Sequence, residues 1–135
     1  MRILLDTNVL LDVTLRREPF FAKSADVLRW AETNSGSAAV AWHTLSNLAY
    51  MLRPDARPFI SSLLRFCSVP SLSLIEALQA VSLPMPDLED AMQSVAAVTF
   101  GADYIVTRDL VDFRNSPIPA ISPEEFLRLC PPRTV

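Results

Sequence analysis

Three aspartates stand where the carboxyl groups of a single site would be expected. Asp6 directly follows a short apolar run at 2–5, and Asp109 comes shortly after a second apolar run at 104–107. Asp90 lies near the start of a helix expected over 87–100. In an open parallel sheet, ligands bind beyond the carboxyl ends of the strands. If both runs are strands of such a sheet, and the helix starts at the same crevice, the three carboxylates meet there.

A cluster of this kind would have a definite chemistry. Closely packed carboxylates repel one another and cannot all stay ionised without a cation. Two cysteines and one histidine are too few for a zinc cluster, and oxygen ligands select a hard ion such as Mg²⁺ or Mn²⁺. Such an ion promotes phosphodiester hydrolysis by activating water and by stabilising charge on the leaving oxygen.

Structural roles compete with this interpretation for several of the acids. Asp6 could cap a helix that begins at Thr7, and Asp87 could equally cap the helix that carries Asp90. Asp12 falls in the first helical turns, as a surface or supporting residue. Asp112 could be a solvated loop residue.

The elements that must position these acids follow from alternating patterns along the chain. Strands are expected at 2–5, 38–41, 66–69, 104–107 and 120–121. Helices are expected at 20–32, 43–52, 56–65, 74–81, 87–100 and 123–129, besides the one after Asp6. Ser73 and Ser122 begin capping-box patterns, and Gly101 suits the end of a helix. Strands that alternate with helices predict an α/β fold with a parallel sheet covered on both faces.

Length and composition exclude several classes of protein. The 135 residues fit one domain, expected over 1–130 with a C-terminal tail at 131–135. Only two glycines occur, which excludes the glycine-rich phosphate loops. The net charge of −3 excludes a globally basic nucleic-acid-binding protein. Neither a signal peptide nor a membrane helix is expected, so we expect a soluble cytoplasmic protein with reduced thiols.

Three blocks of the sequence resemble the PIN domain family. The run Leu-Asp-Thr-Asn-Val-Leu-Leu-Asp at 5–12 is similar to the opening of that domain. The segment 87–93 resembles its central acidic helix, and 101–113, with Thr-Arg-Asp at 107–109, resembles its third block. Residues 119–127 are similar to its C-terminal strand and helix, so order and spacing match along essentially the whole chain. The most similar members in appearance are the compact VapC-type toxins of bacterial toxin–antitoxin pairs.

The resemblance implies a Rossmann-like α/β/α sandwich with a parallel sheet and a metal-dependent endoribonuclease that uses Mg²⁺ or Mn²⁺. It also implies a homodimer and an antitoxin encoded alongside. The family's metal-binding acids fall on Asp6, Asp90 and Asp109, with Asp112 as an additional ligand. Asn8 belongs to the polar pair that follows the first acid. Thr107 matches a position whose hydroxyl would orient a ligand or water.

One position departs from the family pattern. The helix after the second strand usually carries a glutamate, and Asn47 stands in that place. Asparagine keeps a carbonyl oxygen but loses the charge, which should weaken binding of a second ion most. Asn47 and Arg108, which lies beside the expected site, are the candidates for contacts with substrate.

Other cations and aromatic residues gather in the N-terminal part of the chain. The cations are Arg16, Arg17, Lys23 and Arg29, which are candidates for phosphate contacts or for solvated helix faces. Phe20, Phe21, Trp30 and Trp42 could stack bases or pack in a dimer interface, although core packing is the simpler expectation for each.

Three functions compete on this sequence. The first is a Mg²⁺-dependent ribonuclease of the VapC type. The second is a degenerate PIN domain that binds RNA or a protein partner without turnover, which the missing glutamate motivates. The third, a phosphoacceptor receiver domain, requires a lysine after a late strand, and Lys23 is the only lysine. Asp90 has no role in that third function, which therefore ranks far below the others.

Overall fold

The computed structural model describes residues 1–132, and its centre is a parallel sheet of five strands in the order β3-β2-β1-β4-β5. The strands are β1 (Ile3–Leu5), β2 (Ala38–Ala39), β3 (Cys67–Ser68), β4 (Tyr104–Val106) and β5 (Ala120–Ile121). In the register of the sheet, Ile3 lies opposite both Ala38 and Tyr104. The expected strands are confirmed, and four of the five are shorter than the sequence predicts. Residues 133–135 of the expected tail lie outside the described residues.

Helices connect the strands and flank the sheet. They are α1 (Thr7–Thr14), α2 (Phe21–Thr33), α3 (Trp42–Leu52), α4 (Ala56–Leu63), α5 (Leu74–Ser82), α6 (Leu88–Phe100) and α7 (Pro123–Leu129), with short 3₁₀ turns η1 (Arg53–Asp55) and η2 (Leu110–Phe113). The expected helices are confirmed, whereas η1 and η2 have no counterparts in the sequence-based expectation. Gly101 ends α6 in the left-handed conformation, with φ of 77°. This is the role that the pattern predicts for it.

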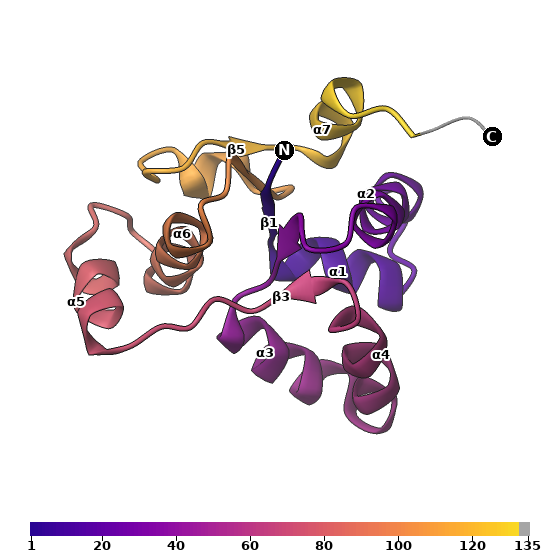
Figure 1. Ribbon diagram of the computed structural model, residues 1–135, viewed down its shortest axis with the longest axis horizontal. Helices are drawn as coiled ribbons and strands as arrows, with labels where there is room; N and C mark the ends of the chain where they lie inside the picture. Colours follow the sequence, from indigo (N-terminus) through magenta and orange to yellow (C-terminus); the bar gives the residue numbers. More distant parts are fainter. Residues whose placement is uncertain (133–135) are drawn as a thin grey trace.

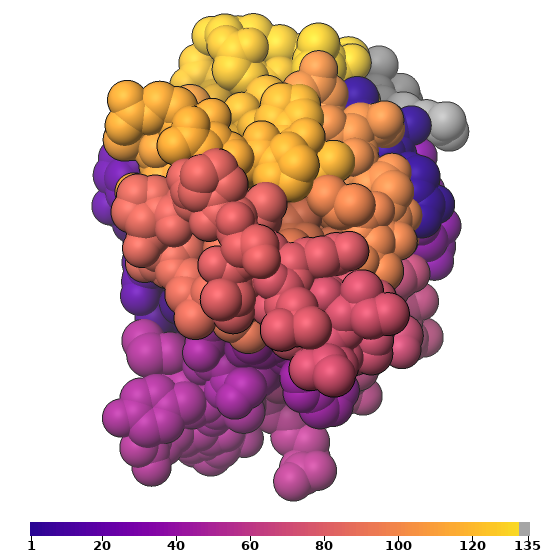
Figure 2. All heavy atoms as spheres, turned by 90° about the vertical axis from the view of Figure 1, so that its left-hand side faces the viewer, coloured from indigo at the N-terminus to yellow at the C-terminus, as the bar shows by residue number. Residues whose placement is uncertain are grey.

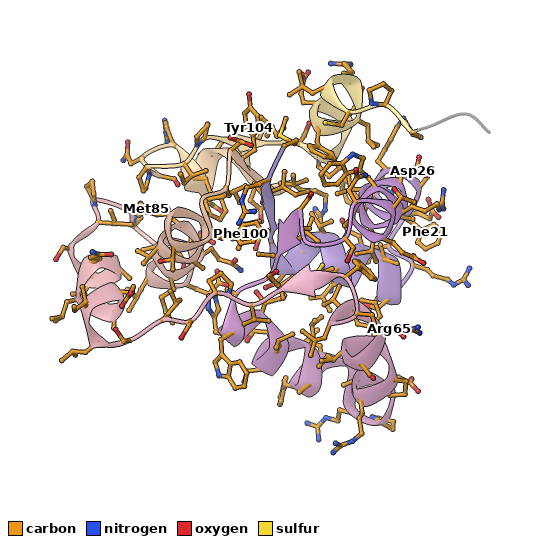
Figure 3. The ribbon with its side chains drawn as sticks, viewed as in Figure 1. Phe21, Asp26, Arg65, Met85, Phe100 and Tyr104 are labelled. Carbon is orange, nitrogen blue, oxygen red and sulfur yellow. The ribbon has the colours of Figure 1, made fainter. Side chains whose placement is uncertain are left out.

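Alternate residues of the strands face opposite layers of helices. Ile3 and Leu5 of β1 pack in one core cluster, whereas Leu4 between them packs in another with residues of α6. Figure 1 shows α6 on one side of β1 and α1 and α2 on the other, with α5 packed outside α6. Figure 3 labels Met85 and Phe100 on the α6 side and Phe21 on α2. The three-layer α/β/α sandwich expected from the sequence is therefore confirmed.

The tryptophans differ in their packing. Trp30 lies edge-on against Phe126, with 4.9 Å between the ring centroids, so α2 and α7 share the core as expected. Trp42 is 70% exposed at the start of α3, so the expectation of core packing is wrong for this residue. None of the helices described in residues 1–132 is both long enough and apolar enough to span a lipid bilayer.

The parallel topology decides where the side chains of the candidate site meet. Asp6 follows β1, Thr107 follows β4 and Ser122 follows β5, so all three stand at the carboxyl edge of the sheet. The chain leaving β2 enters α3 at the same edge. The start of α6 joins this edge through a hydrogen bond from Gln93, on its second turn, to Asp6.

Candidate metal-binding site

Asp6 is the centre of the site. It is only 5% exposed and caps α1, with Oδ1 accepting the backbone N–H of Thr7 at 2.7 Å. Oδ2 accepts the hydroxyl of Thr107 at 2.7 Å. Burial raises the pKa of Asp6 to about 6, although the hydrogen bond from Thr107 acts in the opposite direction. The capping role expected as an alternative is therefore present together with a position inside the site.

Asp109 is tied to Asp6 through Asn8 and Thr107. Asn8 Nδ2 donates to Asp109 Oδ2 at 2.9 Å, and its contact with Thr107 Oγ1 is longer, at 3.4 Å. Thr107 Oγ1 also accepts the backbone N–H of Asp109 at 3.0 Å. Asp109 itself is exposed, so its carboxylate stands at the mouth of the site.

A second group of acids stands at the start of α6. Carboxylate oxygens of Asp87, Glu89 and Asp90 all lie within 4.8 Å of one another. Asp87 is the N-cap of the helix, and its Oδ1 accepts the backbone N–H of Asp90 at 3.2 Å. Asp90 is 9% exposed, and its pKa is raised to about 8 by burial first and then by its interactions with the neighbouring acids. Both burial and the neighbouring carboxylates therefore make ionisation of Asp90 more costly.

Glu89 differs from its neighbours because it has basic and amide partners. His43 Nε2 lies 3.1 Å from Glu89 Oε1, and this contact holds the pKa of Glu89 below its usual range. The half-buried His43 thus links α3 to α6.

Gln93 connects the two groups of acids. It is fully buried on α6, and its Nε2 lies near four acceptor oxygens. These are Asp6 Oδ1 and Glu89 Oε1 at 3.2 Å, Thr7 Oγ1 at 3.2 Å and Thr44 Oγ1 at 3.1 Å. An amide nitrogen has only two hydrogens, so these acceptors exceed what it can satisfy. The site is therefore rich in oxygen and poor in donors.

Two buried side-chain oxygens also lack hydrogen-bond donors within residues 1–132. Among the described residues, the side-chain oxygens Asn8 Oδ1 and Gln93 Oε1 are buried without a hydrogen-bond partner. Buried acceptors of this kind are costly unless another group satisfies them. The possible metal ligands are all oxygen atoms, and burial and neighbouring acids raise the pKa values of Asp6 and Asp90. Such a set of ligands fits a hard divalent cation.

Two further residues expected in the site, Asp112 and Asn47, are exposed in the structure. Asp112 is exposed on η2, and its backbone N–H donates to the carbonyl oxygen of Asp109 at 3.1 Å. Asn47 is exposed on α3, one turn after His43. Neither side chain makes a hydrogen bond within the part of the chain that the structure describes.

Arg108 pairs with Asp12 and makes no hydrogen bond to Asp6, Asp90 or Asp109 in the part of the chain that the structure describes. Its Nε and Nη2 donate to Asp12 Oδ2 and Oδ1 at 2.7 and 3.0 Å. Asp12 is fully buried and also accepts the hydroxyl of Ser24 at 3.1 Å, so it supports the fold and does not lie on the surface. The guanidinium of Arg108 also lies 3.9 Å from the ring centroid of Phe20.

Sequence analysis missed Glu89, Gln93 and Thr44 as parts of the site. Glu89 is adjacent to Asp90 in an acidic segment, and this adjacency is the sequence signal that could have indicated its place in the site. Thr44 Oγ1 lies 2.9 Å from Thr7 Oγ1, a contact between α3 and α1 that only the fold creates.

The fold and the site together define a class: an open parallel α/β sandwich whose buried carboxylates stand at the carboxyl edge of the sheet. The family model described as PIN domain matches residues 2–111. The chain therefore belongs to the PIN domain family. No functionally curated protein matches the sequence significantly.

Solved structures with the same fold include a chain of a toxin–antitoxin complex and chains of two VapBC structures. The chain is similar to one in a toxin–antitoxin complex from Klebsiella pneumoniae, with 21% identity and a TM-score of 0.66 over 90% of this chain and 97% of that one. It is similar to a chain of DNA-bound VapBC from Salmonella typhimurium, with 16% identity and a TM-score of 0.67 over 91% and 98%. For VapBC2 from Rickettsia felis, bound to a promoter DNA fragment, the values are 15% and 0.66 over 90% and 98%.

Proposed function

We propose that this protein is a Mg²⁺- or Mn²⁺-dependent endoribonuclease that acts as the toxin of a toxin–antitoxin pair. The observation that carries the proposal is that Gln93 connects buried Asp6 to the acidic start of α6. Two buried side-chain oxygens without hydrogen-bond partners among the described residues belong to the same network. Membership of the PIN domain family and the toxin–antitoxin complexes among the similar structures support the same function.

Asp6, Asp90 and Asp109 would hold the cation, with Asp112 close enough along the chain to serve as a further ligand. When bound, a divalent ion supplies positive charge that activates water and stabilises the charge developing on the phosphate and on the leaving oxygen. Thr107 donates a hydrogen bond to the carboxylate of Asp6, and Asn8 donates one to the carboxylate of Asp109. These two residues position the ligands, and the buried network holds them in place before substrate arrives.

Two apolar surfaces support the proposed protein partners. A hollow of about 610 Å³ is lined by Trp42, Leu72 and Met92 among others, and we assign it to a segment of the antitoxin. On α5, four apolar side chains are each more than half exposed: Leu74, Ile75, Leu78 and Val81. Figure 2 looks onto this side of the molecule. A contiguous exposed apolar face marks an interaction site, and we assign it to a second copy of the chain.

A degenerate PIN domain that binds RNA without cutting it is the second candidate, because Asn47 replaces the usual acid on α3. The experiment that separates the two is incubation of the purified chain, free of co-purified protein, with a mixed cellular RNA pool. Parallel reactions contain Mg²⁺, Mn²⁺ or a chelator. New RNA ends that appear only with a divalent ion support the nuclease, and intact RNA under every condition favours the binding module.

A further inference from the structure

A second hollow lies at the same edge of the sheet, on the side opposite α6. It has a volume of about 460 Å³ and is open to solvent. Its lining comes from the start of α2, the residue before Asp109 and the start of α7. The residues that matter below are Phe20, Lys23, Arg108, Ser122 and Glu124. The three chain segments meet because β4 and β5 end side by side.

We propose that this hollow binds one nucleotide of a single RNA strand, next to the nucleotide whose phosphate enters the acidic site. The inference rests on the proposed function and adds the path of its substrate. Arg108 lines the hollow, and Asp109, the next residue, bonds to Asn8 in the acidic site. The helix α2 begins at Phe21, which is labelled in Figure 3. An RNA strand that crosses the carboxyl edge of the sheet from α6 toward α2 therefore meets both the acidic site and the hollow.

The aromatic wall of the hollow suits a base. Phe20 is 39% exposed, so it is not packed in the core and part of its side chain is open to a ligand. The guanidinium of Arg108 stacks on its ring, and Arg108 is itself fixed by its two hydrogen bonds to buried Asp12. Aromatic rings and guanidinium planes are the surfaces on which splayed bases of single-stranded RNA stack. The wall is therefore held rigid before any ligand binds.

The charges of the hollow favour a phosphate. Arg108 is neutralised by Asp12, and Glu124 is paired with Arg128 at 2.9 Å. Lys23 is exposed and makes no ion pair within residues 1–132, so it is the charge left free to meet a ligand. A lysine beside an aromatic ring matches one nucleotide, with its phosphate on the ammonium and its base on the ring. The volume lies within the roughly 300–1,000 Å³ of small-ligand sites.

Binding of a fluorescein-labelled 12-nucleotide single-stranded RNA, followed by anisotropy, tests the proposal. The chain carries Asp90→Asn so that it does not cut the probe, and Mg²⁺ is present. Lys23→Glu is expected to raise Kd roughly tenfold and to reduce its salt dependence. The matched control is Arg57→Glu, an equal change of charge at an exposed site on α4, which is expected to leave Kd within about twofold because only one remote charge changes. Equal weakening by both variants overturns the proposal.

A second readout locates the nucleotide directly. RNA containing 4-thiouridine is cross-linked to the same chain by near-ultraviolet light, and the modified peptide is identified by mass spectrometry. Cross-links in 18–24 that disappear with Phe20→Ala, in a variant whose thermal unfolding shows that it is folded, support the proposal. Cross-links confined to other segments overturn it.

The inference and the proposed nuclease fail in different ways. If the wild-type chain cuts RNA, and Lys23→Glu binds and cuts as the wild type does, the hollow is not on the path of the substrate. If RNA cross-links at Phe20 but no condition gives cutting, the nucleotide site stands and the nuclease falls.

Discussion

The hydroxyl of Thr107 donates to Oδ2 of Asp6 at 2.7 Å, although the two residues are 101 positions apart in the sequence. The hydroxyl oxygen of Thr107 also accepts the backbone N–H of Asp109 at 3.0 Å. One hydroxyl thus joins the acid after β1 to the acid after β4. This link is possible only because the two strands are parallel neighbours in the sheet.

Thr107→Val should remove this link while keeping the shape of the side chain. The hydrogen bond lowers the pKa of Asp6, so its loss should raise that pKa further and leave less carboxylate at neutral pH. RNA cleavage at pH 7 should fall by roughly tenfold, and the rising limb of the pH–rate profile should move to higher pH. Thr107→Ser, which keeps the hydroxyl, should restore both. A reduced rate with an unmoved pH profile would show that Thr107 acts only through packing.

The acids that the sequence nominates for the candidate site lie shortly after strands or near the start of a helix. Asp6, Asp90 and Asp109 have such local signals, because strand ends and helix starts are visible in the apolar pattern. Gln93 has none: it is a neutral amide in the middle of a helix, and its importance comes from the way α6 packs against the sheet. Long-range partners of this kind require the fold.

The pairing of Asp12 with Arg108 escaped prediction for the same reason. The two residues are 96 positions apart, and a charged side chain in the first turns of a helix usually faces solvent. The paired segments of β2 and β3 are shorter than the apolar runs at 38–41 and 66–69, although the backbone N–H of Val40 still donates to the carbonyl oxygen of Ser68 at 2.9 Å. An apolar run indicates burial, and Val40 and Ala41 are fully buried although they lie beyond the residues paired in register.

The cation-free protein should lose stability as pH rises. Folding raises the pKa of Asp6 from 3.8 to about 6 and that of Asp90 from 3.8 to about 8. Between pH 3.8 and about 8, the folded state therefore binds protons more tightly than the unfolded state. The free energy of unfolding should therefore fall as pH increases from about 4 to about 8. In chelator, Tm should be lower at pH 8 than at pH 5, and Mg²⁺ should raise Tm more at pH 8.

Two variants check the origin of this pH dependence by thermal denaturation. Asp90→Asn should flatten the fall of Tm with pH, because it removes the acid with the larger rise in pKa. Asp55→Asn, at an exposed position on η1, should leave the slope as in the wild type. A Tm that rises from pH 5 to pH 8 in chelator would contradict the arrangement of buried acids described above.

Breaking the pair of Asp12 and Arg108 from one side should be costly. Arg108→Met leaves the fully buried carboxylate of Asp12 without its cation, and such a loss typically costs about 3–5 kcal/mol. The double variant Asp12→Leu/Arg108→Met should be more stable than Arg108→Met alone, because no buried charge remains. Urea denaturation measures the free energies of unfolding of Arg108→Met, Asp12→Leu and the double variant. A double variant as unstable as the sum of the two single variants would show that the pair is not coupled.

The central claim, that the carboxylates at this edge of the sheet hold a cation for RNA cleavage, is tested most directly by removing them one at a time. The measurement is the cleavage rate of RNA with Mg²⁺ for the wild type, Asp6→Asn, Asp90→Asn and the surface control Asp55→Asn. We predict a loss of at least about a hundredfold for the first two variants and none for the control. Wild-type rates in Asp6→Asn and Asp90→Asn, or cutting by the wild type that persists in chelator, would contradict the account.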